Sequence, residues 1–195
     1  MLSRRTSGRS PQRIDKHGQS AVLKSAGFTI IELVVVIALL GILAAVALPR
    51  FMNISDTAQA NVIEAAASSI EIANNLVRYK ATLENVSSGN IAIEGSNVSI
   101  VAGFPSASWD NTWEHILEVG SQVQTQSYTE TCTLSLCGDG DIGTVNGLPI
   151  SVNAGANGLM ILWPKGLTGQ ESCYAYFYND GTGSTPQVGA VTSGC

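Results

Sequence analysis

An uninterrupted apolar run near the N-terminus constrains this chain more than any other feature. Residues 28–48 read FTIIELVVVIALLGILAAVAL, and Thr29 and Glu32 are the polar members of this stretch. As an α-helix the run would extend about 31 Å, close to the thickness of the hydrocarbon core of a bilayer. The sequence therefore predicts a membrane-spanning helix over 28–48 that carries one carboxylate near its start.

Charge is distributed unevenly on the two sides of this run. Residues 1–27 hold six Lys and Arg against the single acid Asp15, whereas the part after Gly27 holds four cations and 14 acids, a formal net charge of −10. The positive-inside rule places the basic side in the cytoplasm and the rest of the chain across the membrane. The acidic body would repel phosphates, so we expect no binding of nucleic acid by charge.

The composition and the side chains give no support for catalysis. The chain has 195 residues, enough for one sizeable domain plus an appendage, and only 13% of them are charged. His115 has no nucleophile at a recognisable spacing, and Asp139 and Asp141 in GDGDIG lack the remaining ligands of a calcium loop. We expect neither enzymatic activity nor a cofactor nor a metal site, and interpret GDGDIG as a glycine-rich turn.

Four cysteines lie in the second half of the chain: Cys132, Cys137, Cys173 and Cys195. Downstream of a membrane segment, an even number of cysteines fits two disulfides, for which three pairings exist. We favour Cys132–Cys137, which are close in sequence, and Cys173–Cys195, which would tie down the C-terminus. The alternative is a zinc site, but no His lies near these cysteines.

Glu32 admits two interpretations. In the first, it is a solvated carboxylate at the bilayer interface, where the first turn of a helix favours negative charge. Alternatively, it awaits a positive partner within the membrane, where a lone carboxylate is costly. Cleavage after Gly27 would make Phe28 the N-terminus, so the new amine of one copy would be available to Glu32 of another.

The sequence KSAG followed by FTIIELVVVIALLGILAAVALPRF closely resembles the N-terminal signal of type IV pilins and related pseudopilins. This resemblance implies that prepilin peptidase cuts between Gly27 and Phe28 and N-methylates Phe28. It gives Glu32 a role in assembly, and it implies that the helix is flexible near Gly41 and Pro49. Residues 1–27 would then be a leader, longer than is common in the family; a true start near residues 22–23 would shorten it.

After the membrane run, apolar residues continue at helical spacing through 49–80. They form one stripe, which we expect to pack against a sheet in its distal half: Phe51, Ile54, Ala58, Val62, Ala65, Ser69, Ile72, Leu76 and Tyr79. Pro49 would remove a backbone hydrogen bond and bend the helix. A helix from Phe28 to about Lys80 would be roughly 80 Å long, so its first half would project from a globular head.

The remaining chain reads as a connecting region and then strands. Residues 81–120 are rich in Ser, Asn and Gly, with a short helix at WDNTWEHILEVG. Residues 121–195 alternate short strand-like runs with turn signals, and Tyr174, Tyr176 and Tyr178 share one face of a strand. Strands are expected at SQVQTQSYTE, TVNGLPISVN, GLMILWP, CYAYFYND and QVGAVTS. The predicted fold is α+β: a long N-terminal helix whose distal half packs on a C-terminal antiparallel sheet, a pilin ladle.

The family resemblance implies a structural subunit that forms a type IV pilus with copies of itself. GFP, SWDNTWEHILEVG and CYAYFYND resemble the mannose-sensitive haemagglutinin type of major pilin, in the type IVa class, which implies attachment to host or environmental surfaces. Prepilin peptidase and the inner-membrane assembly machinery are the other implied partners. The expected location is the inner membrane, single-pass with a cytoplasmic N-terminus, and then the fimbrium. The alternatives are a type II secretion pseudopilin, a minor pilin or a membrane-anchored binding protein.

Overall fold

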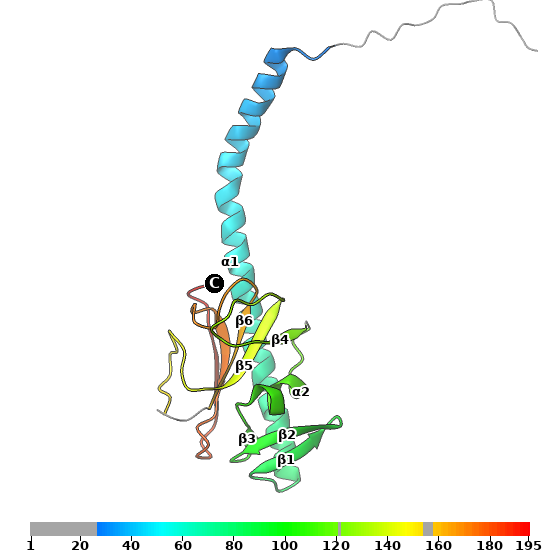
Figure 1. Cartoon of the computed structure of the whole chain (residues 1–195), viewed down its shortest axis with the longest axis vertical. Coiled ribbons are helices and arrows are strands. Elements are labelled where there is room, and N and C mark those ends of the chain that lie inside the picture. The colour runs from blue at the N-terminus through cyan, green and yellow to red at the C-terminus, as the bar shows by residue number, and fades with distance from the viewer. Residues whose placement is uncertain (1–26, 121, 154–157) are drawn as a thin grey trace, which may run out of the picture. The chain divides into compact units, whose positions relative to one another are not determined.

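The structure is a computed structural model that describes residues 27–120, 122–153 and 158–195, apart from the side chains of residues 48–53. The chain divides into two compact units, Met1–Ala45 and Val46–Cys195, and each is described by itself. One helix, α1 (Ile30–Leu83), contributes to both units (Figure 1). The predicted leader up to residue 26, including the alternative start near 22–23, lies outside the described residues.

In the first unit, α1 begins at Ile30 and its start is apolar. The window Ile30–Ala47 is long and apolar enough to cross a membrane, and none of it is buried within the chain. The helix predicted over the apolar run is therefore confirmed, with its first turn two residues later than expected. A run of Val, Ile, Leu and Ala without a glycine or proline until Gly41 favours this helix locally.

The second unit contains two sheets, which Figure 1 shows beside the later part of α1. The first is antiparallel with the order β1-β2-β3: β1 (Gly89–Ile93), β2 (Ser96–Val101) and β3 (Phe104–Pro105). The second has the order β4-β5-β6-β7-β8: β4 (Val123–Thr125), β5 (Leu136–Ile142), β6 (Leu159–Pro164), β7 (Tyr174–Tyr178) and β8 (Gln187–Val191). A π-helical turn, η1 (Trp109–Trp113), and the short helix α2 (Glu114–Ile116) lie between the sheets in the sequence. This is the predicted α+β fold.

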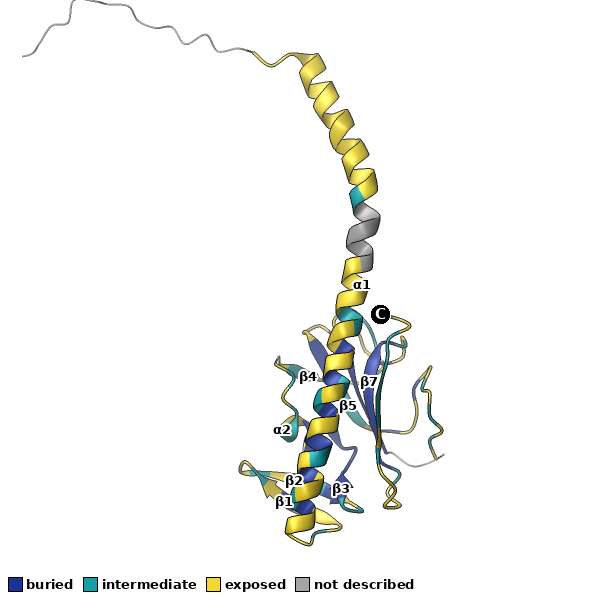
Figure 2. Cartoon of the chain, turned by 180° about the vertical axis from the view of Figure 1, so that it is seen from behind, coloured by how far each residue is buried: buried dark blue, intermediate teal, exposed yellow. Residues whose placement is uncertain are grey.

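Both sheets pack against the buried face of α1 (Figure 2). Toward the five-stranded sheet, α1 contributes Ile63, Ala66, Ile70 and Ala73. Toward the three-stranded sheet, it contributes Val77 and Ala81. We call these six residues the inner seam. Three of the six are alanines, whose small side chains let the sheets approach the helix backbone closely.

The prediction that this apolar stripe packs on the sheet is wrong. Ile54, Ile72, Leu76 and Tyr79 are each about 60% exposed, and Val62 is 45% exposed. The inner seam is shifted from the predicted stripe by one residue, so that Ile63 replaces Val62 and Ala73 replaces Ile72. One residue is about 100° around a helix. α1 therefore carries two adjacent apolar stripes, and its own chain covers only one of them.

The five-stranded sheet is buried on both faces, and one segment that was expected to be a strand is instead a loop that covers the second face. The side chains of β7 alternate as predicted: Ala175 and Phe177 face the helix side, and the three tyrosines face the opposite cluster. That second face is covered by the segment expected to be the strand TVNGLPISVN, which is instead a loop with Leu148, Ile150 and Val152 packed on the tyrosine cluster. Tyr174 donates its hydroxyl to Asn146 O at 2.9 Å and thereby holds this loop.

Three further expectations differ from the structure. Residues 81–120 hold β1–β3 and are not only a connection. GDGDIG is part of β5, not a turn: the Trp109 ring lies where a side chain at Gly138 would point, and Ala107 O lies where one at Gly140 would point. The lack of side chains at Gly138 and Gly140 thus lets η1 and the residues before it pack closely on β5. Finally, β4 pairs with β5 in parallel, so the sheet is mixed, whereas all its other pairs are antiparallel.

Two disulfides complete the second unit, and both have the favoured pairing. The short disulfide, Cys132–Cys137, ties the segment before β5 to the second residue of that strand, and the C-terminal disulfide, Cys173–Cys195, ties residue 195 to the residue just before β7. All four cysteines are thereby paired. Cys132, Cys137 and Cys173 are buried, so these bonds also belong to the core.

Candidate functional site

The first turn of α1 holds its carboxylate in a specific arrangement. Thr29 N donates to Glu32 Oε2 at 2.9 Å, and the Thr29 hydroxyl donates to the same oxygen at 2.8 Å. In return, Glu32 N lies 3.3 Å from Thr29 Oγ1. These bonds form a capping box, in which an N-terminal Thr and a Glu three residues later satisfy backbone donors that the helix itself leaves open.

The capping box was missed in the sequence, although its T-x-x-E signature is present as Thr29-Ile-Ile-Glu32. The capping box gives Glu32 a structural role, because its carboxylate caps the N-terminus of the helix as well as carrying charge. Both bonds from Thr29 go to Oε2. Within the described residues, Oε1 of Glu32 accepts no hydrogen bond from the chain and remains open to another donor.

The predicted cleavage junction lies just outside the helix. Gly27 and Phe28 precede the first residue of α1 and both are exposed; among the described residues beyond its chain neighbours, no atom lies within 4 Å of the position that a Cβ on Gly27 would take. The peptide bond between them is therefore sterically open. Gly41 lies within α1 and is also exposed; Pro49 lies in the helical backbone, and its side chain is outside the described residues. The role of these four residues remains a prediction.

The other polar candidates, His115 and Asp139, lie on different elements, α2 and β5. His115 lies on α2 at the edge of a groove, and among the described residues no cluster of three or more His, Cys, Asp or Glu side chains is placed to hold a metal. Asp139 accepts hydrogen bonds from Tyr128 N at 2.9 Å and from Gly140 N at 2.8 Å. Burial raises the pKa of Asp139, the two amide bonds oppose that shift, and nearby Asp110 and Asp141 add to it. Asp139 thus fastens the segment that leads from β4 to β5.

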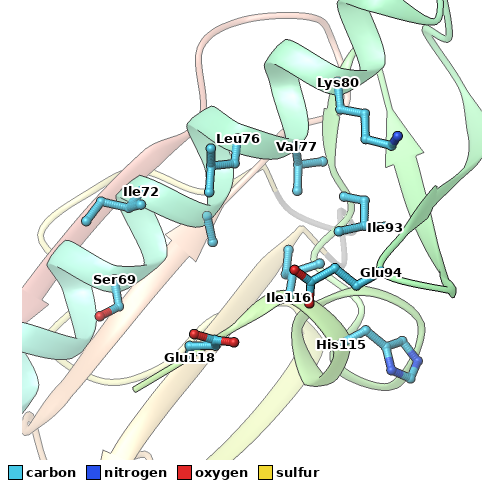
Figure 3. Close-up of a pocket in the computed structure, with 11 residues that line it drawn as sticks. Ser69, Ile72, Leu76, Val77, Lys80, Ile93, Glu94, His115, Ile116 and Glu118 are labelled. Atoms are coloured by element: carbon cyan, nitrogen blue, oxygen red, sulfur yellow. The ribbon is translucent and has the colours of Figure 1, made fainter. Parts of the chain in front are cut away.

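A groove runs beside the exposed stripe of α1 (Figure 3). It has a volume of about 520 Å³, with Ile72 and Leu76 on its helix side and Ile93 and Ile116 on the facing side. A second hollow of about 340 Å³ continues the groove toward Val62 and shares Ser69 with it. Polar side chains also line it: Ser69, Lys80, Glu94, His115 and Glu118.

Comparison with known proteins finds one family match in the N-terminal segment and one similar protein. Residues 23–48 match the family described as prokaryotic N-terminal methylation motif. The chain is also 37% identical, over 59 residues, to the type IV narrow pilus major component PilA5 of Thermus thermophilus. That match covers 30% of this chain and 51% of the relative, so it spans only about half the length of that protein. No solved structure matches.

Proposed function

We propose, from the premise that this chain carries the N-terminal segment of a type IV pilin, that it is a structural subunit of a surface pilus. The single observation that carries this proposal is the window Ile30–Ala47, which is apolar throughout except for Glu32 and has no residue buried by the described part of its own chain. Water excludes such a surface, so it must lie in a bilayer or against other protein. Polymerisation provides the second environment once the subunit leaves the first.

The predicted processing fits this proposal. Prepilin peptidase would cut the Gly27–Phe28 bond and methylate the new N-terminus at Phe28. The open position of this junction ahead of α1 supports access by an enzyme. Removal of the basic leader would also take six Lys and Arg away from the cytoplasmic end of the membrane helix, so extraction from the bilayer would become less costly.

Glu32 would supply the contact that orders assembly. The amine of Phe28 on one copy would pair with Glu32 on the next, which neutralises two charges that are costly in an apolar environment. The capping box supports this role, because Thr29 holds one carboxylate oxygen and leaves the other open. Repetition of this head-to-tail contact without closure gives a helical filament.

We assign the finer role by resemblance. The chain would be the major pilin of an adhesive fimbrium of the mannose-sensitive haemagglutinin type. Its other contacts would be with the inner-membrane assembly machinery and with host or environmental surfaces. The similarity to a protein named as a pilus major component supports the major role. Flexibility of α1 near Gly41 and Pro49 would let packed helices extend.

Mass spectrometry of filaments sheared from cells tests the proposal. A chain that begins at N-methylated Phe28 in the sheared fraction is expected. A processed chain confined to the envelope would favour a pseudopilin or a minor pilin, and an uncut chain would favour a membrane-anchored binding protein. Glu32→Ala should reduce filament yield at least tenfold while membrane insertion persists; normal filaments from this variant would remove Glu32 from the assembly contact.

A further inference from the structure

Strand β8 is the last strand of the five-stranded sheet, so one of its two sides forms an open edge. Its five residues pair with β7, and the described part of the chain offers their backbone groups no other hydrogen bond. In an antiparallel strand, every second residue directs both its N–H and its C=O away from the strand to which it is paired. β8 therefore presents a row of backbone donors and acceptors that another strand can bind.

The end of the chain lacks the features that usually protect such an edge. Residues 181–195 contain no Asp, Glu, Lys, Arg or His, and β8 contains no proline. Edge strands in most proteins carry charged side chains or proline, or are very short. The chain after Gly27 has 14 acids and four Lys and Arg, so two copies repel each other over most of their surface. At the β8 edge, however, two copies can meet without bringing charged side chains together.

Tyr176 brings an unpaired hydroxyl to the same edge. It is the middle one of the three tyrosines of β7, and the hydroxyls of Tyr174 and Tyr178 are each bonded at 2.9 Å to the loop that covers their face of the sheet. The Tyr176 hydroxyl has no hydrogen bond to a described residue, although Tyr176 is only 6% exposed. The end of its ring lies over Gly189 of β8, where a Cβ would be 2.7 Å from the hydroxyl oxygen. A strand added beside β8 would lie about 4.8 Å away, within reach of this hydroxyl.

β8 is complementary to itself when two copies pair antiparallel about Gly189. In this register Gln187 of one copy lies opposite Val191 of the other. Val188 likewise lies opposite Ala190, and both of these pack on the helix side of the sheet, whereas Val191 packs on the tyrosine side. Residues that lie opposite each other thus belong to the same face, so the two five-stranded sheets would continue as one sheet.

We infer that the β8 edge is an interaction surface for a second copy of this chain, whose own β8 pairs with it antiparallel about Gly189. The two Tyr176 hydroxyls meet above the central glycines and bond to each other there. Antiparallel pairing also reverses β7, which runs beside the part of α1 in the second unit (Figure 2), so the two copies point in opposite directions. Copies in one filament all point the same way, and the pair therefore joins two filaments. This inference rests on the proposed function, because a filament repeats the edge many times and adds weak contacts into a strong one.

Photo-crosslinking of the full chain in sheared filaments tests the register of this pair. A benzophenone amino acid is placed at Gln187 or, as the control, at Asn90, which is also exposed but lies on β1, the edge strand of the other sheet. Position 187 should crosslink to residues near 191 of another copy, and position 90 should give about tenfold fewer crosslinks to β8. Crosslinks from 187 to 187 would indicate parallel strands, and crosslinks to β1 or to another protein would indicate a different partner. Each of these results would overturn the inference.

Two double variants give an independent measurement with matched effects on folding. Gln187→Asp/Val191→Asp places like charges opposite each other at both ends of the pair, whereas Gln187→Lys/Val191→Asp places opposite charges there. Both variants share the change at Val191, so their unfolding temperatures should agree within about 2 °C. The fraction of filaments that sediment as bundles at low speed should fall about tenfold or more in the first variant and stay within about twofold of wild type in the second. Equal bundling of the two variants, or wild-type filaments that sediment singly, would refute the β8 pair and leave the proposed function intact.

Failure of the proposed function gives a different result, because the wild type would then form no filaments. The same crosslinking is in that case done on the full chain in concentrated detergent micelles. A crosslink from 187 to 191 of a second copy would support the pair, and a crosslink from 187 to any other site, or none between copies, would refute it.

Discussion

Ile70 and Ile72 form a matched pair on α1 that separates the two stripes of the helix. They have the same side chain and lie two residues apart, yet Ile70 is 0% exposed and Ile72 is 61% exposed. Ile70 belongs to the inner seam and packs in the cluster that contains Met160, Leu162 and Phe177. We therefore expect Ile70→Ala and Ile72→Ala to have different effects on folding and on assembly.

The size of each effect follows from burial. Ile→Ala in a core costs about 2–5 kcal/mol, so roughly 3 kcal/mol is expected for Ile70. Complete burial of such a side chain contributes about 1.5–3 kcal/mol, and only about two-fifths of Ile72 is covered, which gives roughly 0.6–1.2 kcal/mol. The better helix propensity of Ala recovers about 0.4 kcal/mol of this. For a chain of this size, the unfolding temperature should fall by about 6–12 °C for Ile70→Ala and by less than about 3 °C for Ile72→Ala.

Thermal unfolding of the full chain in detergent micelles, followed by near-ultraviolet circular dichroism of the buried Trp109 and Trp113, gives both shifts. Filament yield from cells that express each variant gives the second readout. Ile72→Ala should lower this yield while it leaves the fold nearly unchanged. An unfolding shift for Ile72→Ala as large as that for Ile70→Ala would mean that the predicted stripe, not the inner seam, packs on the sheets, and our account of α1 would be wrong.

Three further predictions concern local interactions. Thr29→Val should remove the capping box, at a cost of about 1 kcal/mol, and speed amide exchange in the first turn of α1 in micelles, whereas Thr29→Ser should not; equal exchange in both would contradict the role of the hydroxyl. Replacing the two cysteines of one disulfide by Ala should lower the free energy of unfolding, measured in urea. The expected loss is about 3.4 kcal/mol for the C-terminal disulfide, with a sequence separation of 22, and about 2.1 kcal/mol for the short one, with a separation of 5. The reverse order would show that loop closure does not dominate. Burial raises the pKa of Asp139 in the folded state. The contribution of this shift to the free energy of unfolding is therefore fully present below pH 3.8 and is lost as pH rises through the raised pKa. Asp139→Asn should therefore gain stability relative to wild type between pH 3 and pH 7, and a relative loss over that range would show that the amide bonds outweigh desolvation.

The parts of the fold that were predicted are those with a strong local pattern. The apolar run became a helix because a helix satisfies its backbone hydrogen bonds within the segment itself, even in an apolar environment. The hydrophobic runs of β6 and β7 became strands, and the alternation of Tyr174, Tyr176 and Tyr178 specified which side chains share a face. The disulfide pairing also followed from spacing, because the two pairs close separate loops.

The parts that were missed depend on contacts between distant residues. β1 and β2 are short, polar in part and joined by Glu94 and Gly95, so they read as a loop until α1 covers their inner side. Gly138 and Gly140 lack side chains where Trp109 and Ala107, which precede them by about 30 residues, occupy the space. The prediction chose the wrong stripe on α1 for the same reason, because the helical period of the apolar residues does not indicate which stripe the sheets of the chain will cover.

For the candidate site, the sequence identified Gly27, Phe28 and Glu32 as the residues of interest, and their roles stay predictions. It did not identify the partner of Glu32 within the chain, although the T-x-x-E signature at Thr29 was available. Nor did it identify the groove, because Ile93 and Ile116 reach the helix only through the placement of the β1–β2 turn and α2. A groove assembled from three elements has no signature in any one of them.

The side chain of Asn179 joins the two sheets. Its Nδ2 donates to Pro105 O at 2.9 Å and to Val101 O at 3.2 Å, both from the three-stranded sheet, while its Oδ1 accepts from Gly181 N at 2.9 Å just after β7. In the proposed function the subunit would be pulled as well as heated, and under tension the weakest contact in a domain opens first. Separation of β1–β3 from the five-stranded sheet would therefore also break the two hydrogen bonds that Asn179 donates. The head should therefore resist shear as one cooperative body.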